Sequence, residues 1–234
     1  CGIGYSVQYE HVYRLPKIYA RPYGTKTFKP TDDIEGWADC FGVLMSSYFY
    51  CSSDNQERQP YYSRFHEYSG FEIKFDLSDI RPKGAEISGG FKAPGPKGLK
   101  KSLEKVEELI EKRLQTGDKL EPIDCYDIIC HEGDAVLSGG VRRSATICIF
   151  SPEDIDMLDS KTFANFNINA GINPQRARSN NSAALLRWST SYEKFNSILQ
   201  RTKDQGDPGF YFVTDLDEVP NPCVEIGMWP ILMS

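Results

Sequence analysis

The stretch EPIDCYDIICHEGDAVLSGGVRRSATICIF, residues 121–150, contains the succession of elements that decides the fold. Residues 121–137 are expected to form a helix, because Pro122 suits a first helical turn and Asp124 suits the positive end of the helix dipole. The glycines that follow break this pattern, and Ala145 to Phe150 is expected to form a strand. A helix, a glycine-rich loop and a strand in this order are typical of an α/β fold with parallel neighbouring strands.

The rest of the chain continues this alternation. Strands are predicted at residues 1–7, 71–77, 183–186, 210–213 and 221–226, and helices at 35–50, 99–114, 152–158 and 192–200. The segments 51–70 and 80–96 are expected to be irregular, since the first is polar and unpatterned and the second is rich in glycine and proline. Because no internal repeat or linker divides the chain, residues 1–234 are expected to form a single α/β domain.

The composition argues against several classes of protein. The 234 residues carry a net charge of −6, which disfavours direct binding of nucleic acid. No apolar run approaches the ~20 residues of a membrane span, and no signal peptide is recognisable. The seven cysteines lack C-x-x-C spacing and the three histidines are scattered, so no metal site or disulfide framework is expected and a reducing cytoplasm is indicated. The start at Cys1 and the apolar end at 231–233 suggest a chain cut from a longer polypeptide.

The run Asn221-Pro222-Cys223-Val224-Glu225 places an amide, a thiol and a carboxylate on alternate residues. In an extended backbone, alternate side chains point to the same face, so these three groups would converge on one small volume. Such a group suits an active site. The alternative is a strand with a buried, inert cysteine.

The glycine-rich loop 138–144, between the predicted helix 121–137 and the predicted strand 145–150, is a second candidate site. Consecutive glycines let backbone N–H groups turn toward one ligand, and two arginines offer forked donors to phosphate. The alternative is a turn with solvated arginines. The residues expected to bind substrate or effector in this loop are Ser138, Gly139, Gly140, Arg142, Arg143 and Ser144.

Two further polar segments complete the candidates. Arg81 and Lys83 lie in the stiff segment 80–96, which suits recognition of an anionic nucleotide or is simply a surface connection. Ser179, Asn180 and Asn181 offer a hydroxyl and two amides that can read a sugar or a base edge, although Asn-Asn is also a common turn pair. Together these loops predict a nucleotide pocket at the mouth of an α/β fold.

These motifs resemble, in the same order, those of ribonucleotide reductase catalytic subunits, most closely the adenosylcobalamin-dependent (class II) type. The resemblance covers the chain from end to end, and only the segment 51–70 shows no counterpart. The matching stretches are 2–7, 15–16, 35–39, 80–84, 92–96, 139–145, 178–182 and 221–226.

The resemblance implies that the chain is part of a ten-stranded α/β barrel with a central finger loop. Cys223 would become the thiyl radical that abstracts the 3′-hydrogen of the substrate ribose. Glu225 would take the proton of the 3′-hydroxyl, and Asn221 would hydrogen-bond the sugar hydroxyls. The loop 138–144 matches the specificity loop between substrate and effector, and 80–96 lies near the other loop that contacts the effector.

The same resemblance implies a set of partners. These are a ribonucleoside di- or triphosphate substrate, a deoxynucleotide or ATP effector, a thioredoxin-type dithiol reductant, adenosylcobalamin as cofactor and a second copy in a homodimer. The family's redox cysteine pair has no counterpart in this chain, nor has its substrate-phosphate segment. The other cysteines are therefore expected to be structural, and the isolated chain is expected to be inactive.

Four other interpretations stay open from the sequence. The chain could bind nucleotide without catalysis, complete its barrel with a partner chain as a split subunit, or belong to a class I large subunit that receives its radical from another protein. It could also be an unrelated α/β nucleotide-binding protein whose motifs match by chance.

Overall fold

The computed structural model describes residues 2–49, 64–87, 91–135 and 145–229. The chain forms two compact units. The first, called the sheet unit, comprises residues 1–14, 121–133 and 143–234. The second, called the helix unit, comprises residues 15–120 and 134–142. The expectation of a single catalytic domain stays a prediction.

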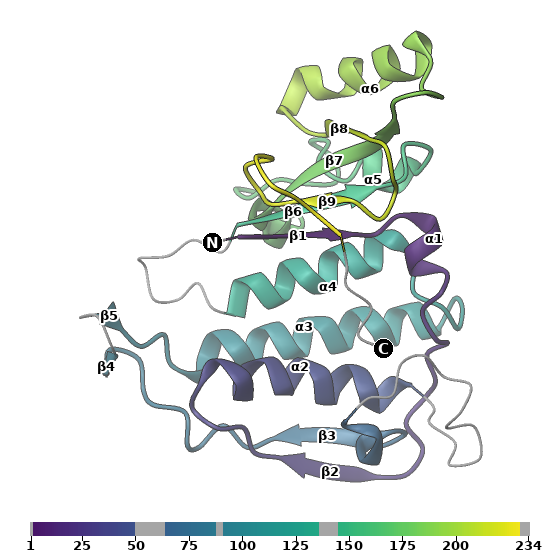
Figure 1. The fold of residues 1–234 in the computed structure, drawn as a ribbon. Coiled ribbons are helices and arrows are strands. Elements are labelled where there is room, and N and C mark those ends of the chain that lie inside the picture. The colour runs from purple at the N-terminus through teal and green to yellow at the C-terminus, as the bar shows by residue number, and fades with distance from the viewer. Residues whose placement is uncertain (1, 50–63, 88–90, 136–144, 230–234) are drawn as a thin grey trace. The chain divides into compact units, whose positions relative to one another are not determined.

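The sheet unit is built on four parallel strands in the order β1-β6-β7-β8 (Figure 1). They are β1 (Ile3–Ser6), β6 (Thr146–Phe150), β7 (Ser179–Leu186) and β8 (Gly209–Val213). The helices are α1 (Tyr9–Val12), α4 (Pro122–Ala135), whose residues up to Gly133 belong to this unit, α5 (Ile155–Leu158), the 3-10 helix η5 (Pro174–Arg178) and α6 (Tyr192–Gln205). The predicted α/β class with parallel neighbours is confirmed.

The strand β6, one of the two inner strands of this sheet, is buried along its whole length. All five residues of β6 are buried, as expected for a parallel strand that is covered on both faces. Asp154 caps α5 by accepting a hydrogen bond from the N–H of Met157 at 3.0 Å. The predicted strand 145–150 and the predicted helix near 152–158 are thus confirmed.

Side chains alternate between the two faces of the sheet. One row of paired residues joins Gly4, Ile147 and Asn180, and the next row joins Tyr5, Cys148 and Asn181. We call the side of the second row the closed face, because it is buried against α4, where Tyr126 and Cys130 are also fully buried. We call the side of the first row the hairpin face. Part of it is a cluster of Ile147, Ile149, Ala184 and Val213, against which Leu216 and Val219 pack.

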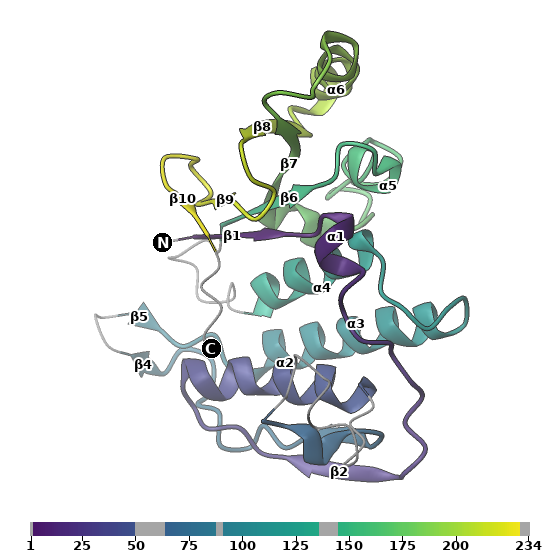
Figure 2. The same ribbon diagram turned by 45° about the vertical axis from the view of Figure 1, so that its right-hand side comes forward.

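The hairpin that gives this face its name consists of β9 (Val219–Pro220) and β10 (Gly227–Met228), paired antiparallel. Figure 2 shows it beside β1, and β1 and β9 are in contact. Two sequence predictions are corrected in this unit. The polar run from Ser179 to Ser182 is the first half of β7 and not a loop, and residues 221–226 are the turn of the hairpin and not a strand.

The helix unit pairs two long helices with short strands (Figure 1). Its elements are β2 (Thr25–Phe28), α2 (Ile34–Tyr48), the 3-10 helix η2 (His66–Tyr68), β3 (Glu72–Phe75), β4 (Glu86–Ile87), β5 (Phe91–Lys92) and α3 (Pro96–Leu114). The apolar stripe predicted for the long helix 99–114 is buried at Leu99, Leu103, Val106 and Ile110. The predicted helix 35–50 is α2, which begins after Asp33, whose carboxylate accepts from the N–H of Gly36 at 2.7 Å.

The helix unit contains one strand that was not predicted and one prediction that is wrong. The strand that was not predicted is β2, which pairs in parallel with the predicted strand β3. The segment 80–96 is not wholly irregular, because β4 and β5 pair antiparallel within it. Among the helices of the described ranges, none has the length and apolar character needed to cross a membrane.

Candidate active site

The turn of the hairpin carries the three residues predicted to be catalytic. The N–H of Val224 donates to the carbonyl oxygen of Asn221 at 2.9 Å, and the N–H of Asn221 donates to that of Ile226 at 3.0 Å. Pro222 occupies the second position of this turn, where its fixed φ is favoured. The geometric basis of the sequence prediction is therefore wrong, because the backbone at 221–225 is not extended.

The side chain of Asn221 explains why a turn replaces the strand. Its Oδ1 accepts from the N–H of Glu225 at 3.1 Å and from the N–H of Ile226 at 3.0 Å. A carboxamide that satisfies backbone donors in this way competes with strand pairing. Val224, which precedes Glu225 in the turn, has a φ of 65°, in the left-handed region that β-branched residues rarely adopt.

The turn still carries all three functional groups, and none of them is buried. Cys223 and Glu225 are exposed, and Asn221 is half-buried. Within the described part of the chain, the Nδ2 group of Asn221 makes no hydrogen bond, so it can donate to a ligand while Oδ1 shapes the turn. The arrangement offers an accessible thiol, a carboxylate and an amide donor.

The predicted trio at the start of β7 divides between the two faces of the sheet. Ser179 and Asn181 are buried on the closed face, where Ser179 Oγ lies 3.3 Å from the Tyr5 hydroxyl and Asn181 Nδ2 donates to Ser160 Oγ at 2.9 Å. Asn180 is exposed and lies in the row of Gly4, on the hairpin face. Of the three, Asn180 is the residue that can face a ligand on the side of Cys223.

The buried thiols differ from Cys223 in accessibility. Burial raises the pKa of Cys130 from 9.0 to about 12 and raises that of Cys148 well above its ordinary range. Burial also raises the pKa of Cys40, in the helix unit, to about 12. These thiols stay protonated and shielded at neutral pH, which agrees with the structural role predicted for them.

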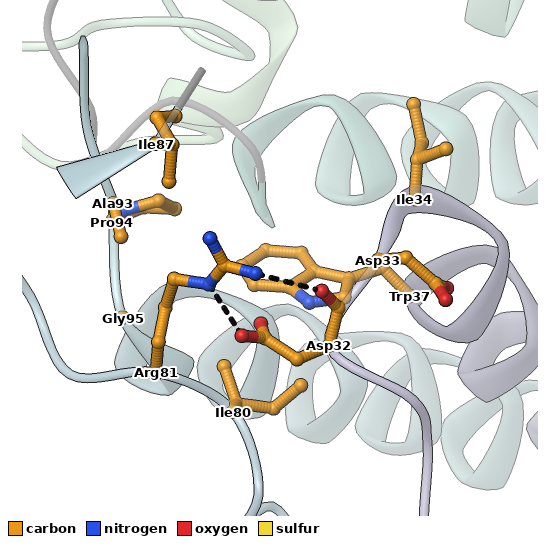
Figure 3. A pocket seen from close by; sticks show the side chains of 10 residues that line it. All are labelled: Asp32, Asp33, Ile34, Trp37, Ile80, Arg81, Ile87, Ala93, Pro94 and Gly95. Carbon is orange, nitrogen blue, oxygen red and sulfur yellow. Dashed lines mark hydrogen bonds and ion pairs between the residues drawn. The ribbon is translucent and has the colours of Figure 1, made fainter. Parts of the chain in front are cut away.

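The helix unit contains a cavity of about 460 Å³ at the start of α2 (Figure 3). Arg81, predicted to bind an effector, lies in it: its Nε donates to the Asp32 carboxylate and its Nη2 to the Asp32 carbonyl oxygen at 3.3 Å. The indole of Trp37 lies beside the guanidinium. Apolar side chains complete the wall, namely Ile34, Ile80, Ile87, Ala93 and Pro94.

This cavity combines an apolar wall and an indole with a charged rim, which suits a flat heteroaromatic ring with a polar substituent. Lys83 is exposed nearby, and its backbone lies against Gly95, where an added Cβ would approach Lys83 N to 2.7 Å. The sequence analysis missed Asp32 and Trp37. Trp37 lies in the predicted helix 35–50, where apolar residues at helical spacing are equally typical of a face packed in the core.

The glycine-rich loop stays untested. The predicted binding residues Ser138, Gly139, Gly140, Arg142, Arg143 and Ser144 lie outside the described residues. Their assignment to a substrate or effector site therefore stays a prediction.

The fold of this chain is shared with part of a solved structure. A crystal structure of B12-dependent (class II) ribonucleotide reductase matches 97% of this chain with a TM-score of 0.76 at 23% identity, over 35% of its own length. This likeness establishes the fold of the chain, as part of the reductase barrel.

Sequence comparison leads to the same proteins. The adenosylcobalamin-dependent ribonucleoside-triphosphate reductase of Lactobacillus leichmannii is 31% identical over 222 residues, and that of Levilactobacillus brevis is 28% identical over 219. No protein-family profile matches the chain. Each alignment covers 86% of the chain, which spans about a quarter (26%) of these curated relatives. The chain is therefore homologous to a segment of the adenosylcobalamin-dependent ribonucleotide reductases, as its motifs indicated.

Proposed function

We propose that this chain is part of the catalytic subunit of an adenosylcobalamin-dependent ribonucleotide reductase and that Cys223 is its radical-bearing thiol. The observation that carries the proposal is the exposed Cys223 on a hairpin turn, with Glu225 two residues away, on the hairpin face of a parallel sheet. The homologous relatives, which are named for ribonucleoside triphosphates, support that substrate class for the whole protein.

The chemistry assigns one role to each group. A thiyl radical at Cys223 takes the 3′-hydrogen of the ribose, while Glu225 accepts the proton of the 3′-hydroxyl and Asn221 Nδ2 donates to a sugar oxygen. The 2′-hydroxyl leaves as water. A dithiol is oxidised to a disulfide, its two electrons reduce the sugar, and the 3′-hydrogen returns from the Cys223 thiol, which regenerates the radical. The thioredoxin-type dithiol is the proposed final reductant.

One cysteine of the described residues is exposed enough to meet the cofactor. When bound, adenosylcobalamin would supply a carbon-centred radical, which can take a hydrogen atom only from a thiol that it can reach. Among the cysteines that the structure describes, Cys223 is exposed, Cys125 is half-buried, and Cys40, Cys130 and Cys148 are buried. Cys223 is therefore the residue that would face the cofactor.

An assay of the full-length protein tests this proposal. Ribonucleoside triphosphate and diphosphate reduction is measured with adenosylcobalamin and a dithiol for wild type, Cys223→Ala and Cys130→Ala. We expect cobalamin-dependent activity on triphosphates that Cys223→Ala abolishes and Cys130→Ala retains. Activity that needs a separate radical-generating protein, or that survives in Cys223→Ala, would overturn the assignment. The 234-residue chain alone is expected to be inactive.

The cavity of Arg81 is the proposed effector site. Its wall of Trp37 and isoleucines suits a nucleobase, and Arg81, together with the nearby Lys83, suits an anionic group. Calorimetric titration of the full-length protein with deoxynucleoside triphosphates and with ATP tests this assignment. Arg81→Ala should weaken binding about tenfold, the cost of one charge-assisted hydrogen bond. Lys29→Ala, which removes an exposed cation paired with Asp79, should leave it unchanged. Unchanged binding in Arg81→Ala would place the effector elsewhere.

A further inference from the structure

Gly4 in β1 and Gly2, just before β1, lie directly beneath the hairpin. A Cβ added at Gly4 would lie 1.8 Å from the carbonyl oxygen of Pro220 and 2.7 Å from Val219 Cγ1. A Cβ added at Gly2 would lie 2.4 Å from Pro222 Cγ and 2.3 Å from the carbonyl oxygen of Ala145. None of these distances leaves room for a side chain, so the Pro220 backbone lies directly on Gly4 and the Pro222 ring lies directly on Gly2.

Space, and not backbone conformation, requires glycine at these positions. Neither Gly2 nor Gly4 is among the glycines with positive φ, so alanine could adopt their dihedral angles. Glycine within a strand is typical of a place where another backbone approaches closely. Here the approaching groups are the backbone of Pro220 at Gly4 and the ring of Pro222 at Gly2, and this segment leads directly into Cys223.

The corner after β1 holds the same hairpin at a second point. Gln8, which is 2% exposed, donates from Nε2 to the carbonyl oxygen of Leu216 at 2.8 Å. His11 Nε2 lies 2.9 Å from Asp217 Oδ1, and His11 Nδ1 lies 2.6 Å from Ser6 Oγ. Leu216 and Asp217 immediately precede β9, so these contacts fix where the hairpin begins.

We propose that β1 and the corner that follows it position the Cys223 thiol. Gly2 and Gly4 set the distance between the hairpin and the sheet. Gln8 and His11 fix its starting point. This inference rests on the proposed function of Cys223. None of these residues needs to touch substrate, so they are positioning residues.

The size of the expected effect follows from the geometry. A methyl group at Gly4 must move away from a carbonyl oxygen now 1.8 Å distant, and ordinary contact needs about 3.4 Å. The hairpin would therefore shift by more than an ångström. A displacement of this size at a reacting group lowers the rate by about 100-fold.

The test uses the full-length protein with Gly4→Ala and the matched control Gly117→Ala. Gly117 has open space around its added Cβ and no positive φ, so alanine there should be neutral. For Gly4→Ala we expect kcat to fall about 100-fold with KM for the nucleotide little changed, because positioning of the thiol acts on the transition state. The rate at which iodoacetamide modifies Cys223 should also differ from that in Gly117→Ala.

A second pair of variants tests the positioning of the Cys223 thiol if Gly4→Ala does not fold. Asp217→Ala removes the contact with His11 at an exposed residue without adding volume to β1, whereas Asp217→Asn keeps an oxygen that accepts from His11 Nε2. We expect Asp217→Ala to lower kcat and Asp217→Asn to restore it.

Two results would overturn the inference: a folded Gly4→Ala with the kcat and Cys223 reactivity of Gly117→Ala, or equal kcat values for Asp217→Ala and Asp217→Asn. If the wild type shows no reductase activity, the proposed function fails. The modification rates of Cys223 in the four variants then still decide whether β1 positions the thiol.

Discussion

The two faces of the parallel sheet carry the same kinds of residue in opposite states. On the closed face, Cys148 and Asn181 are buried among Tyr5, Tyr126 and Cys130. On the hairpin face, Asn180 is exposed, and Cys223 is exposed on the hairpin turn. A thiol or an amide is thus structural on one face and available for chemistry on the other. Whether a thiol or an amide is buried depends on what packs against its face of the sheet and not on the residue type.

The largest effect is expected from the buried ion pair beside the closed face. Arg176 meets both carboxylate oxygens of Asp127, at 2.9 and 2.7 Å, and Gln175 donates to the same carboxylate at 3.0 Å. Removing one partner of a buried pair leaves an uncompensated charge, so Asp127→Ala should lower the free energy of unfolding by about 3–5 kcal/mol. Urea unfolding monitored by circular dichroism measures this change.

The control for this prediction is the exposed pair of Lys194 and Glu153. Glu153→Ala should change the unfolding free energy by less than about 1 kcal/mol, because exposed pairs contribute little. Equal effects of Asp127→Ala and Glu153→Ala would mean that the region beside the closed face is not closed to water.

The neighbouring asparagines of β7 give a sharper comparison with a smaller effect. Asn181→Ala removes a buried hydrogen bond to Ser160 and should destabilise the protein by about 1–3 kcal/mol. Asn180→Ala should change stability by no more than about 0.5 kcal/mol, as for an exposed residue. Thermal melts of both variants measure the difference. A larger loss of stability in Asn180→Ala would reverse our assignment of the faces.

The smallest effect concerns alkaline pH. Because the folded-state pKa of Cys130 is raised from 9.0 to about 12, the unfolded chain ionises first as pH rises. The stabilisation from this group is complete below about pH 9 and is lost progressively up to about pH 12, by about 1.4 kcal/mol at pH 10.

A variant at Cys130 checks the pH dependence. Urea midpoints between about pH 7 and pH 10 should fall less steeply in Cys130→Ala than in wild type, because one ionising group with a raised pKa is removed. Identical slopes in the two proteins would contradict a buried thiol at Cys130.

Part of this fold could be predicted from residue pattern alone. The helix α3 was predictable because its apolar residues recur with helical spacing, and β6 because it is a short run of β-branched and apolar residues. The start of β7 was not, because Ser179 and Asn181 find their partners in Tyr5 and Ser160, which are remote in sequence. Local pattern does not contain such partners.

The candidate site shows the same limit. The residues of the 221–225 motif were predicted, but their conformation was not. The Oδ1 of Asn221 accepts two backbone hydrogen bonds, from Glu225 and Ile226, and these outweigh the alternation that suggests a strand. Trp37 was not predicted as a site residue, because apolar residues at helical spacing cannot show that one of them lines a cavity. The space required above Gly2 and Gly4 is visible only in three dimensions.

The most direct test of the difference between the two faces is the order in which the cysteines react in the native protein. The full-length protein is treated with iodoacetamide at neutral pH, and modified peptides are quantified over time by mass spectrometry. We predict that Cys223 reacts first, while Cys130 and Cys148 react only after unfolding in urea. Modification of Cys130 or Cys148 as fast as Cys223 in the native protein would contradict our account of the two faces.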